Sequence, residues 1–379
     1  QIAICFPADS KLVDKPLAVE YNQPSCECLF FSGEKQLKAL VYTAPYNFEY
    51  TDFPHPALGD DEVLVRVKAC GICGSDVHGA TGETGRRLPP LIMGHEAAGV
   101  VEQVGGNVEG FEQGDRVCFD STVYCNQCPP CKAGLFNRCE KRQVLGVSPG
   151  DFKRHGAMAE YVAVPWWIVS KIPENMSFVR AALLEAVSIG VHAASRAPIT
   201  QEDTVVVIGT GTIGLFIMQA AKLKGPKKVI ACDIDKFRLD TAAKLGADVL
   251  INPAQSSIKE AILEQTDGKG ANVTFEAVGY AQTFADAIAV TRTGGHIVIV
   301  GNLEQRAEFN PQGLVAGELT LTGSYASSGE FPACIDLVAS GKIDVDPLIS
   351  DVVPLSEGAA AFDRLLKAEE NLLKIVLEP

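Results

Sequence analysis

The sequence predicts an α/β protein in which an irregular β-barrel is followed by a doubly wound parallel sheet. Two observations carry this prediction. Short strands with Gly, Pro and Asp at their turns fill the first half of the chain, and strands alternate with helices from about residue 180 onward. With 379 residues the chain is too long for one ordinary domain, so two or three domains are expected.

The strands of the predicted barrel begin at Lys38. They are the segments KALVYTAPYNFEYTDFP, EVLVRVKACGICGSD, AAGVVEQVGGNV and GDRVCFD, each bounded by turn residues. Short strands with frequent turn residues are typical of an all-β unit rather than a helical one. Residues 1–37 show no periodicity, and we expect an N-terminal extension of unknown role there.

The second half begins with a predicted helix, RAALLEAVSIGVHAASR, and then alternates between strands and helices. The predicted strands are DTVVVIG, KVIACDID, ADVLIN, NVTFEAVG and HIVIVGN, and the helices between them are TIGLFIMQAAKLKG, KFRLDTAAKLG, SIKEAILEQTDG and AQTFADAIAVTR. Such alternation builds a parallel sheet covered by helices on both faces. From about Ser324 we expect a helix, a strand region and a further helix.

The composition excludes some functions. Hydrophobic residues make up 47% of the chain and the formal net charge is -14. A protein this acidic repels nucleic-acid phosphates and anionic membranes, so neither is an expected partner. The chain has 12 cysteines and opens with QIAICFPADSK, which has neither a basic region nor a long apolar stretch. We therefore expect a cytoplasmic protein whose cysteines have metal or thiol roles.

A dinucleotide-binding pattern lies where the first helix of the parallel sheet begins. The pattern G-x-G-x-x-G falls at Gly209, Gly211 and Gly214, directly after a predicted strand. The three glycines allow a tight turn, close approach of the pyrophosphate, and close packing of helix on strand, and the helix N-terminus faces the phosphates. The pattern in this context predicts a Rossmann domain.

An acidic residue selects the dinucleotide. Asp233 ends the next strand, 19 residues after Gly214, where a carboxylate binds the adenosine ribose and repels the 2′-phosphate of NADP. A solvated strand-end aspartate is the alternative, and Arg238 is either beside the ribose or a surface charge. We expect NAD, contacted by Gly209, Gly211, Thr212, Ile213, Gly214, Asp233, Arg238 and Val300.

Four cysteines form a dense cluster with the spacing Cys125-x2-Cys128-x2-Cys131-x7-Cys139. Four thiolates at such spacings fit a closed tetrahedral zinc site, which has no open position and is structural. Disulfides and an iron–sulfur cluster are the alternatives.

A second group of metal-ligand residues precedes this cluster. The segment Cys70-Gly-Ile-Cys73-Gly-Ser75-Asp76-Val-His78 ends a strand, and Gly94-His95-Glu96 follows. Alone, Cys70 and Cys73 could be half of a zinc ribbon, and His95 could be a core histidine. Together they favour a metal site.

These segments resemble the zinc-dependent medium-chain dehydrogenase family, the zinc alcohol dehydrogenases. GHEAAGVVEQVGGNV matches the signature G-H-E-x2-G-x5-G-x2-V, and the segment around Cys73 looks like the motif G-x-C-G-S-D-x-H. The resemblance covers Lys38 to the C-terminus and implies a GroES-like catalytic domain with a cysteine lobe (38–187), a Rossmann domain (188–323) and a return to the catalytic domain (324–379).

The resemblance implies a catalytic zinc held by Cys73 and His95. We expect Glu185 as the third ligand, as in the polyol and threonine dehydrogenase branch, with Glu96 either a direct ligand or a neighbour of the ligands. Two zinc ions per chain are therefore expected. Cys70 does not match a ligand position and is interpreted as a packed core thiol.

The family's chemistry is hydride transfer from an alcohol to the nicotinamide. A zinc with three protein ligands keeps an open position for the alcohol and lowers its pKa. Ser75 and His78 resemble the family's proton relay, with Asp76 bracing the loop or the histidine. The expected catalytic residues are Ser75, His78, Cys73, His95 and Glu96.

The substrate is expected to be a secondary alcohol of the polyol or polyol phosphate type. Sorbitol dehydrogenases carry an Arg-Tyr pair where this chain has Ala326 and Ser327, and a tyrosine where it has Gly79, which argues against sorbitol itself. Arg86 and Arg87 could bind a phosphate, as in galactitol 1-phosphate, or could be a solvated basic loop.

Several alternatives remain open. The chain could be a threonine or simple alcohol dehydrogenase, a zinc-free reductase, a non-catalytic relative or a zinc module that binds nucleic acid. The segment GELTLTGSY (317–325) resembles the edge strand through which family members pair, so a homodimer or homotetramer is expected.

Overall fold

The computed structural model describes residues 35–147, 154–304, 306–308, 311–368 and 371–379. The N-terminal extension expected at 1–37 therefore lies almost wholly outside the described residues. The description that follows concerns the unit Lys35–Pro379.

The barrel is built on two antiparallel strands, β3 (Glu62–Gly71) and β5 (Glu96–Val104). The main sheet has the order β10-β6-β5-β3-β18-β17, β9 also pairs with β3, and a smaller sheet has the order β2-β1-β4. The other strands are β1 (Gln36–Ala44), β2 (Asn47–Pro54), β4 (Leu91–Ile92), β6 (Arg116–Phe119), β9 (Tyr161–Pro165), β10 (Val169–Lys171), β17 (Ile349–Pro354) and β18 (Lys374–Glu378).

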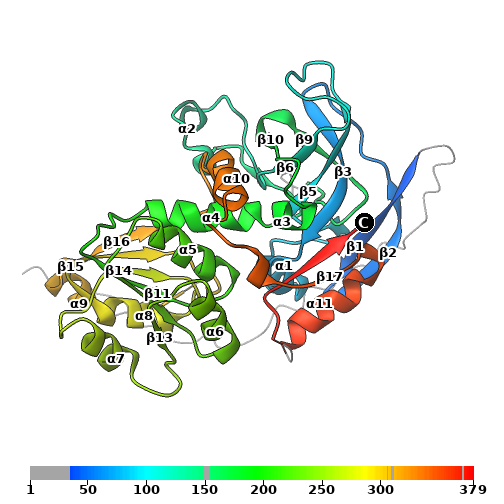
Figure 1. The fold of residues 1–379 in the computed structure, drawn as a ribbon. Helices are drawn as coiled ribbons and strands as arrows, with labels where there is room; N and C mark the ends of the chain where they lie inside the picture. The colour runs from blue at the N-terminus through cyan, green and yellow to red at the C-terminus, as the bar shows by residue number, and fades with distance from the viewer. Residues whose placement is uncertain (1–34, 148–153, 305, 309–310, 369–370) are drawn as a thin grey trace, which may run out of the picture. The chain divides into compact units, whose positions relative to one another are not determined.

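The end of the chain returns to this barrel (Figure 1). β18 pairs antiparallel with the end of β3, where Val376 faces Gly71, and β17 runs parallel beside β18. Helix α11 (Gly358–Lys367) joins the two strands. The last strand is thereby placed next to the segment that carries Cys73.

The second sheet is parallel throughout and has the order β13-β12-β11-β14-β15-β16. This is the strand order of a Rossmann domain, in which ligands bind at the carboxyl ends of the strands where the order reverses. The strands are β11 (Thr204–Ile208), β12 (Lys228–Cys232), β13 (Val249–Ile251), β14 (Ala271–Glu276), β15 (Thr291–Ile299) and β16 (Thr320–Gly323).

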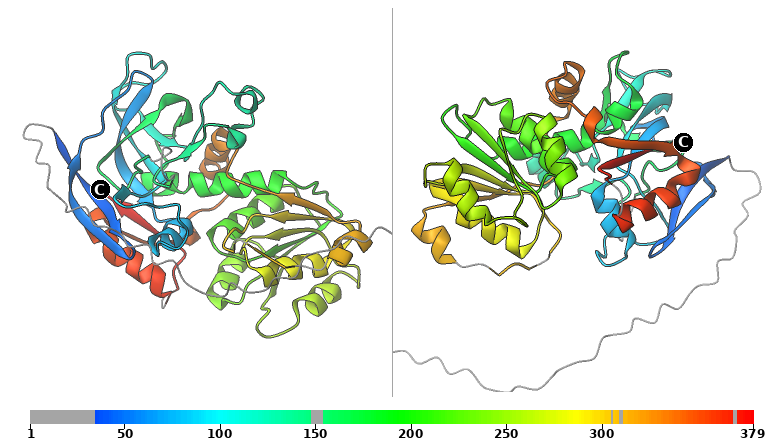
Figure 2. Two further views of the ribbon diagram at one scale, coloured as in Figure 1. Left: turned by 180° about the vertical axis from the view of Figure 1, so that it is seen from behind. Right: turned by 60° about the horizontal axis from the view of Figure 1, so that its bottom comes forward.

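Both faces of the parallel sheet are covered because side chains alternate along each strand. In β11, Val205 and Val207 pack on one face with α4, α5, α6 and α10, whereas Val206 and Ile208 pack on the other with α7 and α8 (Figures 1 and 2). The helices are α4 (Leu184–Ser195), α5 (Thr212–Lys222), α6 (Lys236–Lys244), α7 (Ile258–Gln265), α8 (Ala281–Val290) and α10 (Phe331–Ala339).

One predicted helix is divided. The segment expected as a single helix forms α3 (Phe178–Ala182) and α4, with a turn at Leu183 between them. Ser177 caps α3, and the boundary expected at residue 187 falls inside α4, so no linker separates the two parts there. The remaining short elements are α1 (Gly74–Ala80), α2 (Pro129–Lys132), α9 (Pro311–Ala316), β7 (Thr122–Val123), β8 (Gln143–Val144), and 3₁₀ turns at Phe136–Arg138, Trp166–Ile168, Asp346–Leu348 and Leu355–Glu357.

Candidate active site and metal centres

The ends of two paired strands bring the first group of metal-ligand residues together. Gly71 ends β3 and faces Glu96, which begins β5. Cys73 then forms the N-cap of α1, and His95 directly precedes β5. One ligand atom each from Cys73, His95 and Glu96 lies within 4.8 Å of the others. The register of the barrel therefore builds this group.

Gly71 leaves the space that Glu96 occupies. A Cβ at position 71 would lie 2.5 Å from Oε2 of Glu96, closer than any real contact. A side chain there would push the carboxylate away from Cys73 and His95. The glycine is thus required by the close approach and not by its backbone conformation.

Two buried cations hold the carboxylates of this site. Nζ of Lys374, on β18, lies 2.7 Å from Oε2 of Glu96 and donates to the carbonyl of Ile72 at 3.0 Å. Nη2 of Arg87 lies 2.7 Å from Oδ1 of Asp76. All four side chains are almost fully buried. The charges are therefore compensated in pairs, as buried charges must be.

Asp76 lies beside the candidate ligands. Its Oδ1 is 3.5 Å from Nδ1 of His95, and its Oδ2 accepts from the backbone N–H of Cys73 at 3.3 Å. A carboxylate in this position orients a metal-binding histidine and sets its tautomer. Of the two bracing roles expected for Asp76, the hydrogen bond from Cys73 supports the one on the loop, and the histidine nearby is His95 instead of His78.

The protonation equilibria follow from this arrangement. Burial alone would raise the pKa of Asp76, but His95 and Arg87 outweigh it and hold that pKa well below its usual range. Burial opposes protonation of His95, yet Asp76 and Cys73 raise its pKa well above 6.5. Because a histidine ligand must be neutral, metal binding at this site would release a proton.

The donor set fits zinc. A thiolate, an imidazole and a carboxylate at mutual distances of a few ångströms are the ligands of a catalytic zinc with an open fourth position. Nδ1 of His95 lies 3.5 Å from Oδ1 of Asp76, and a nearby carboxylate is usual for metal-binding histidines.

The expected ligand Glu185 lies outside this group of side chains. This residue lies in the first turn of α4, and its Oε1 accepts a hydrogen bond from Ser121 Oγ at 2.6 Å. Its carboxylate is not part of the group that Cys73, His95 and Glu96 form. Burial raises its pKa to about 7, with His95 opposing and Glu96 adding to the effect. In this structure Glu96 is the carboxylate grouped with Cys73 and His95, whereas Glu185 is hydrogen-bonded to Ser121.

The structure also corrects the paired arginines. Arg87 is 3% exposed and its guanidinium is engaged by Asp76 and Ser75, whereas Arg86 is exposed. The two side chains therefore do not form a free clamp for a phosphate.

The relay residues both lie on α1. Ser75 Oγ donates to Cys73 Sγ at 3.3 Å, and His78 is exposed one turn further on. No side-chain hydrogen bond joins His78 to Ser75 in the part of the chain that the structure describes.

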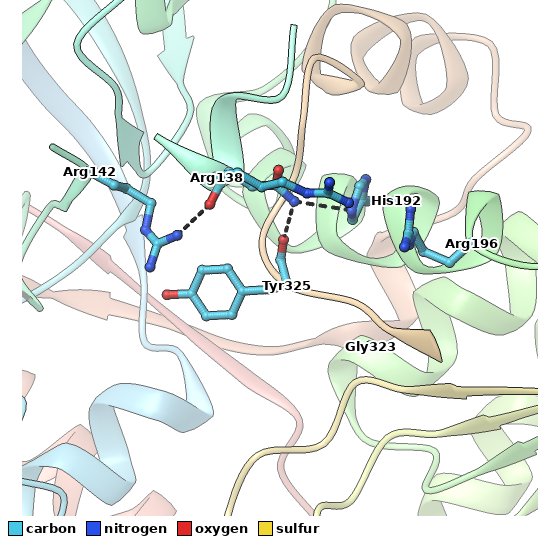
Figure 3. Close-up of a pocket in the computed structure, with 7 residues that line it drawn as sticks. Arg138, Arg142, His192, Arg196, Gly323 and Tyr325 are labelled. Carbon is cyan, nitrogen blue, oxygen red and sulfur yellow. Dashed lines mark hydrogen bonds between the residues drawn. The ribbon is translucent and has the colours of Figure 1, made fainter. Parts of the chain in front are cut away.

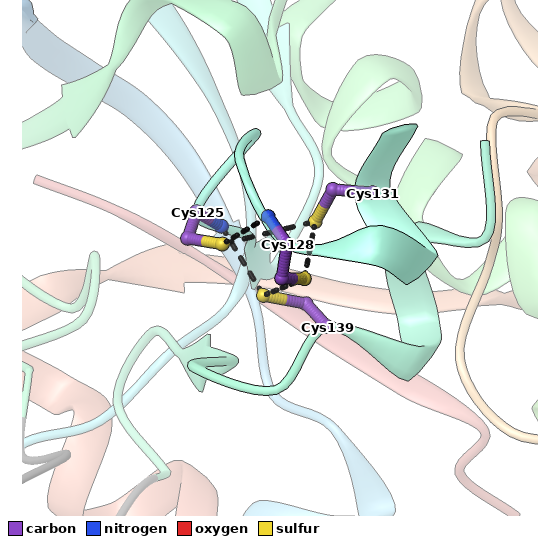
Figure 4. A group of neighbouring side chains, drawn as sticks. All are labelled: Cys125, Cys128, Cys131 and Cys139. Atoms are coloured by element: carbon purple, nitrogen blue, oxygen red, sulfur yellow. Dashed lines mark hydrogen bonds between the residues drawn. The ribbon is translucent and has the colours of Figure 1, made fainter. Parts of the chain in front are cut away.

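The four cysteines of the lobe converge on one point (Figure 4). Their sulfurs lie 3.4 Å (Cys128 to Cys131), 3.9 Å (Cys128 to Cys139) and 4.0 Å (Cys125 to Cys131) apart. A tetrahedral zinc with bonds of about 2.3 Å has sulfur–sulfur edges of about 3.8 Å, whereas a disulfide bond is only about 2.0 Å long. The cluster therefore fits one closed ion, and the disulfide alternative is wrong.

Backbone N–H groups donate to two sulfurs of this lobe and favour the thiolate form of Cys125, whereas burial raises the pKa of Cys131 and Cys139. Those of Cys125 and Lys141 donate to Cys139 Sγ, and that of Cys128 donates to Cys125 Sγ. Hydrogen bonds from the backbone of Gln127 and Cys128 lower the pKa of Cys125 to about 6. Thiolates are the form that binds a metal.

The glycine-rich turn has the geometry of a dinucleotide cradle. Gly209 has a φ of +90°, and a Cβ at Gly214 would lie 1.8 Å from the carbonyl oxygen of Gly209. Gly211 is the N-cap of α5, and a Cβ there would meet nothing within 4 Å. The first and third glycines are thus required by the turn, whereas the second faces open space at the helix N-terminus, where a pyrophosphate fits.

Asp233 holds this turn together. Its Oδ2 accepts from the backbone N–H of Thr210 at 2.7 Å, and its Oδ1 accepts from that of Asp235 at 2.9 Å. Arg238 Nη1 lies 4.0 Å from Oδ2. Oδ2 also accepts from Thr210 Oγ1 at 3.2 Å, so it is Oδ1 that keeps a lone pair for a further donor. Thr212 donates to the carbonyl of Leu373 at 3.3 Å, and Ile213 and Val300 are partly buried against the core.

A separate cavity of about 290 Å³ lies beside the cysteine lobe (Figure 3). Arg142 lies over the ring of Tyr325 at 4.5 Å, and Asn137 Nδ2 donates to the carbonyl of Tyr325 at 2.8 Å. The full lining is Asn137, Arg138, Arg142, His192, Arg196, Gly323 and Tyr325. None of these residues belongs to the predicted site.

Sequence reasoning missed Lys374 and Ser121 as parts of the site. A lysine inside the apolar run KIVLEP is the one available signal for Lys374, because unpaired lysines are almost never fully buried. Nothing in the sequence near Ser121 indicates its contact with Glu185. Among the described residues, no helix combines the length and apolar character that crossing a membrane requires.

Comparison with known proteins agrees with this geometry. Residues 59–174 match the family model "Alcohol dehydrogenase GroES-like domain" and residues 212–340 match "Zinc-binding dehydrogenase". The sorbitol dehydrogenase of Bacillus subtilis (strain 168) is 34% identical over 91% of this chain and 98% of its own length. The probable D-xylulose reductase A of Aspergillus clavatus is 38% identical with the same two coverages.

A solved structure agrees as well. A zinc-binding dehydrogenase of Sinorhizobium meliloti 1021 bound to NADP superimposes with a TM-score of 0.84 at 31% identity, covering 91% of this chain and 100% of the other. The GroES-like and Rossmann parts, the signature at His95 and these relatives lead to one conclusion: the chain belongs to the zinc-dependent medium-chain dehydrogenase family, in its polyol dehydrogenase branch, and is an oxidoreductase.

Proposed function

We propose that this protein oxidises a secondary alcohol of a polyol to the ketone with NAD as the hydride acceptor. The observation that carries the proposal is the group Cys73, His95 and Glu96, built at the ends of β3 and β5 beside Ser75. The polyol class is supported by the relatives, which are named sorbitol dehydrogenase and D-xylulose reductase.

The chain's own residues have separate tasks in this reaction. Cys73, His95 and Glu96 would hold a catalytic zinc, which supplies a Lewis acid when bound. Asp76 and Lys374 keep the histidine and the glutamate in position. Ser75 Oγ would accept the proton of the alcohol and release its own hydroxyl proton, which would pass by way of water to the exposed His78 and from there to solvent. Cys125, Cys128, Cys131 and Cys139 would hold a structural zinc.

A substrate screen with NAD tests the proposal. It compares polyols, their phosphate esters, simple secondary alcohols and threonine. We expect the highest kcat/KM on an unphosphorylated polyol, because the burial of Arg87 removes the argument for a phosphate clamp. Preference for threonine or a simple alcohol would contradict the polyol proposal. Absence of any NAD-linked oxidation by protein with two zinc ions would contradict the enzymatic one.

The preference for NAD rests on Asp233. Although the solved relative named above binds NADP, this chain has a buried carboxylate where a 2′-phosphate would lie. Asp233→Asn removes the charge but keeps an acceptor for Thr210, and it leaves Arg238 free to meet the phosphate. We expect the ratio of kcat/KM for NADP to that for NAD to rise about 10- to 100-fold. A change of this size corresponds to the free energy of one hydrogen bond to a charged group.

The matched control for this change is Asp240→Asn, which removes an exposed carboxylate from α6. It should leave the ratio unchanged. If Asp233→Asn kept the native ratio of kcat/KM for NADP to that for NAD, Asp233 would not select the dinucleotide.

We also propose that two copies pair through β16, as a homodimer or within a homotetramer. This strand is the edge of the parallel sheet, and Leu321, Tyr325 and Val315 nearby are exposed apolar or aromatic side chains. An unpaired edge is usually covered. Light scattering should give two or four chains, and Leu321→Lys should reduce that number. The free thiols of the lobe support a reducing, cytoplasmic location, which cell fractionation would test.

A further inference from the structure

Arg87 is a buried cation that directly contacts the candidate proton relay. Its Nη2 lies 2.7 Å from Oδ1 of Asp76 and donates to Ser75 Oγ at 3.1 Å, and its Nε donates to Asp76 Oδ1 at 3.3 Å. One guanidinium thus contacts both the residue that orients His95 and the residue that handles the proton.

The path of Arg87 depends on Gly79. A Cβ at position 79 would lie 1.9 Å from Cδ of Arg87 and 2.5 Å from its Nε. Gly79 is a buried position of α1, and glycine is a poor helix former. Its φ is not in the left-handed region, so the backbone does not require it. The helix accepts a glycine here because the missing side chain is the space that the arginine fills.

The hydrogen bond from Arg87 restricts the orientation of the Ser75 hydroxyl. A serine hydroxyl has one hydrogen and two lone pairs. The hydrogen points to Cys73 Sγ at 3.3 Å, and one lone pair accepts from Arg87. A single lone pair remains, and its direction is set by the other two bonds. Ser75 Oγ is therefore oriented before a substrate arrives.

The contact with Asp76 has a different consequence. Asp76 is fully buried, and its Oδ1 faces His95 Nδ1 at 3.5 Å. Without the guanidinium it would be a buried carboxylate paired only with a histidine that must be neutral to bind metal, a costly arrangement. Arg87 therefore holds Asp76 in place behind His95 and balances its buried charge.

We propose that Arg87, in the space left by Gly79, is a positioning residue that orients the Ser75 hydroxyl and braces His95 through Asp76. This inference rests on the proposed function for its Ser75 part. In this role Arg87 acts through Ser75 and Asp76 and not on the substrate. It is therefore not available to bind a substrate phosphate.

Lysine at position 87 separates the two tasks. A single ammonium can pair with Asp76 but cannot reproduce the fork that also reaches Ser75. Arg87→Lys should keep zinc and NADH binding within twofold of the native values, while kcat falls about 10-fold or more. Arg87→Met should lose both contacts, so zinc retention against a chelator falls about 10- to 100-fold as well. Gly79→Ala should behave like Arg87→Met, because the Cβ displaces the guanidinium.

The control variants make the same types of substitution, Arg to Met and Gly to Ala, away from the site. Arg66→Met removes an exposed guanidinium from the same barrel, where it pairs with Glu102 at 3.6 Å, and Gly106→Ala adds a Cβ with only one neighbour, at 3.8 Å. Both should retain native zinc retention and kcat. In a Ser75→Ala background, Arg87→Lys should cause no further loss of kcat, since the contact it weakens is gone.

The outcomes distinguish this inference from the proposed function. Native kcat in Arg87→Lys, or a loss that is equally large in the Ser75→Ala background, overturns the Ser75 part. Native zinc retention in both Arg87→Met and Gly79→Ala overturns the bracing part. A native enzyme that oxidises no alcohol counts against the proposed function instead, and the zinc-retention series still decides the role of Arg87 behind His95.

Discussion

Glu96→Gln is expected to empty the catalytic metal site and to lower alcohol oxidation by about 1000-fold. Glutamine offers an uncharged oxygen in place of a carboxylate, so the positive ion loses a charged ligand. It also leaves the buried Lys374 without a negatively charged partner, although the amide oxygen can still accept its hydrogen bond. Loss of several kcal/mol of metal-dependent stabilisation corresponds to about three orders of magnitude in rate. Zinc content per chain, by atomic emission, should fall from two to one.

Glu185→Gln is expected to behave differently, and the comparison identifies the ligand. The amide can still accept the hydrogen bond from Ser121 Oγ, which is 2.6 Å away in the native protein. Since burial already raises the pKa of Glu185 to about 7, the neutral form is accessible and the substitution imitates it. We expect two zinc ions per chain and a fall in kcat of about 10- to 100-fold, as for residues next to metal ligands.

The matched control is Glu102→Gln, on the same strand as Glu96 but only half-buried and paired with Arg66. It should have native zinc content and activity. If Glu185→Gln lost the metal and Glu96→Gln kept it, the third ligand would be Glu185, as the sequence motif alone suggests.

The sequence predicts those parts of the site that depend on local spacing. The four cysteines lie within 15 positions, Cys125 to Cys139, so their convergence needs only one turn of helix and a short loop. The turn at Gly209 is likewise local, and its strand and helix are both visible in the hydrophobic pattern. For the same reason most strands and helices of both halves are confirmed.

The parts of the site that could not be predicted depend on contacts between residues distant in the chain, or on the space available to a side chain. Lys374 reaches Glu96 across 278 positions, because β18 returns to pair with β3. The choice between Glu96 and Glu185 depends on which buried carboxylate the fold places beside Cys73 and His95, which the sequence does not show. From the sequence, Arg87 looks like an exposed arginine in a loop. Its burial depends on the space left by the missing side chain of Gly79.

Removal of the metal from the cysteine lobe is the second large effect that we expect. Cys131→Ala takes one of four sulfurs from a closed site, and the remaining three cannot complete a tetrahedron. Zinc content should fall to one per chain, with the loss at the structural site. The thermal midpoint should fall by roughly 10 °C, because several kcal/mol of metal-linked folding energy are lost at roughly 2–4 °C per kcal/mol.

The lobe is joined to the rest of the unit by side chains around Asn137, so its loss should reach the active site. Asn137 Nδ2 donates to the carbonyl of Tyr325, and Ser328 Oγ donates to the carbonyl of Gly134 at 3.0 Å. Ser327, between them, donates to Asp120 at 2.7 Å, next to the residue that binds Glu185. We therefore expect Cys131→Ala to lower kcat as well, even though its catalytic zinc is retained.

Cys232→Ala is the matched control, because it removes an equally buried thiol from β12 that belongs to neither metal group. It should keep two zinc ions and lower the midpoint by only a few degrees, the cost of a small cavity. Equal midpoints and equal zinc contents in the two variants would show that the four sulfurs do not hold a metal. Cys131→Ala could instead have a low thermal midpoint that added zinc does not restore, and yet a native kcat at temperatures below that midpoint. In that case the lobe would stabilise the fold without supporting the active site.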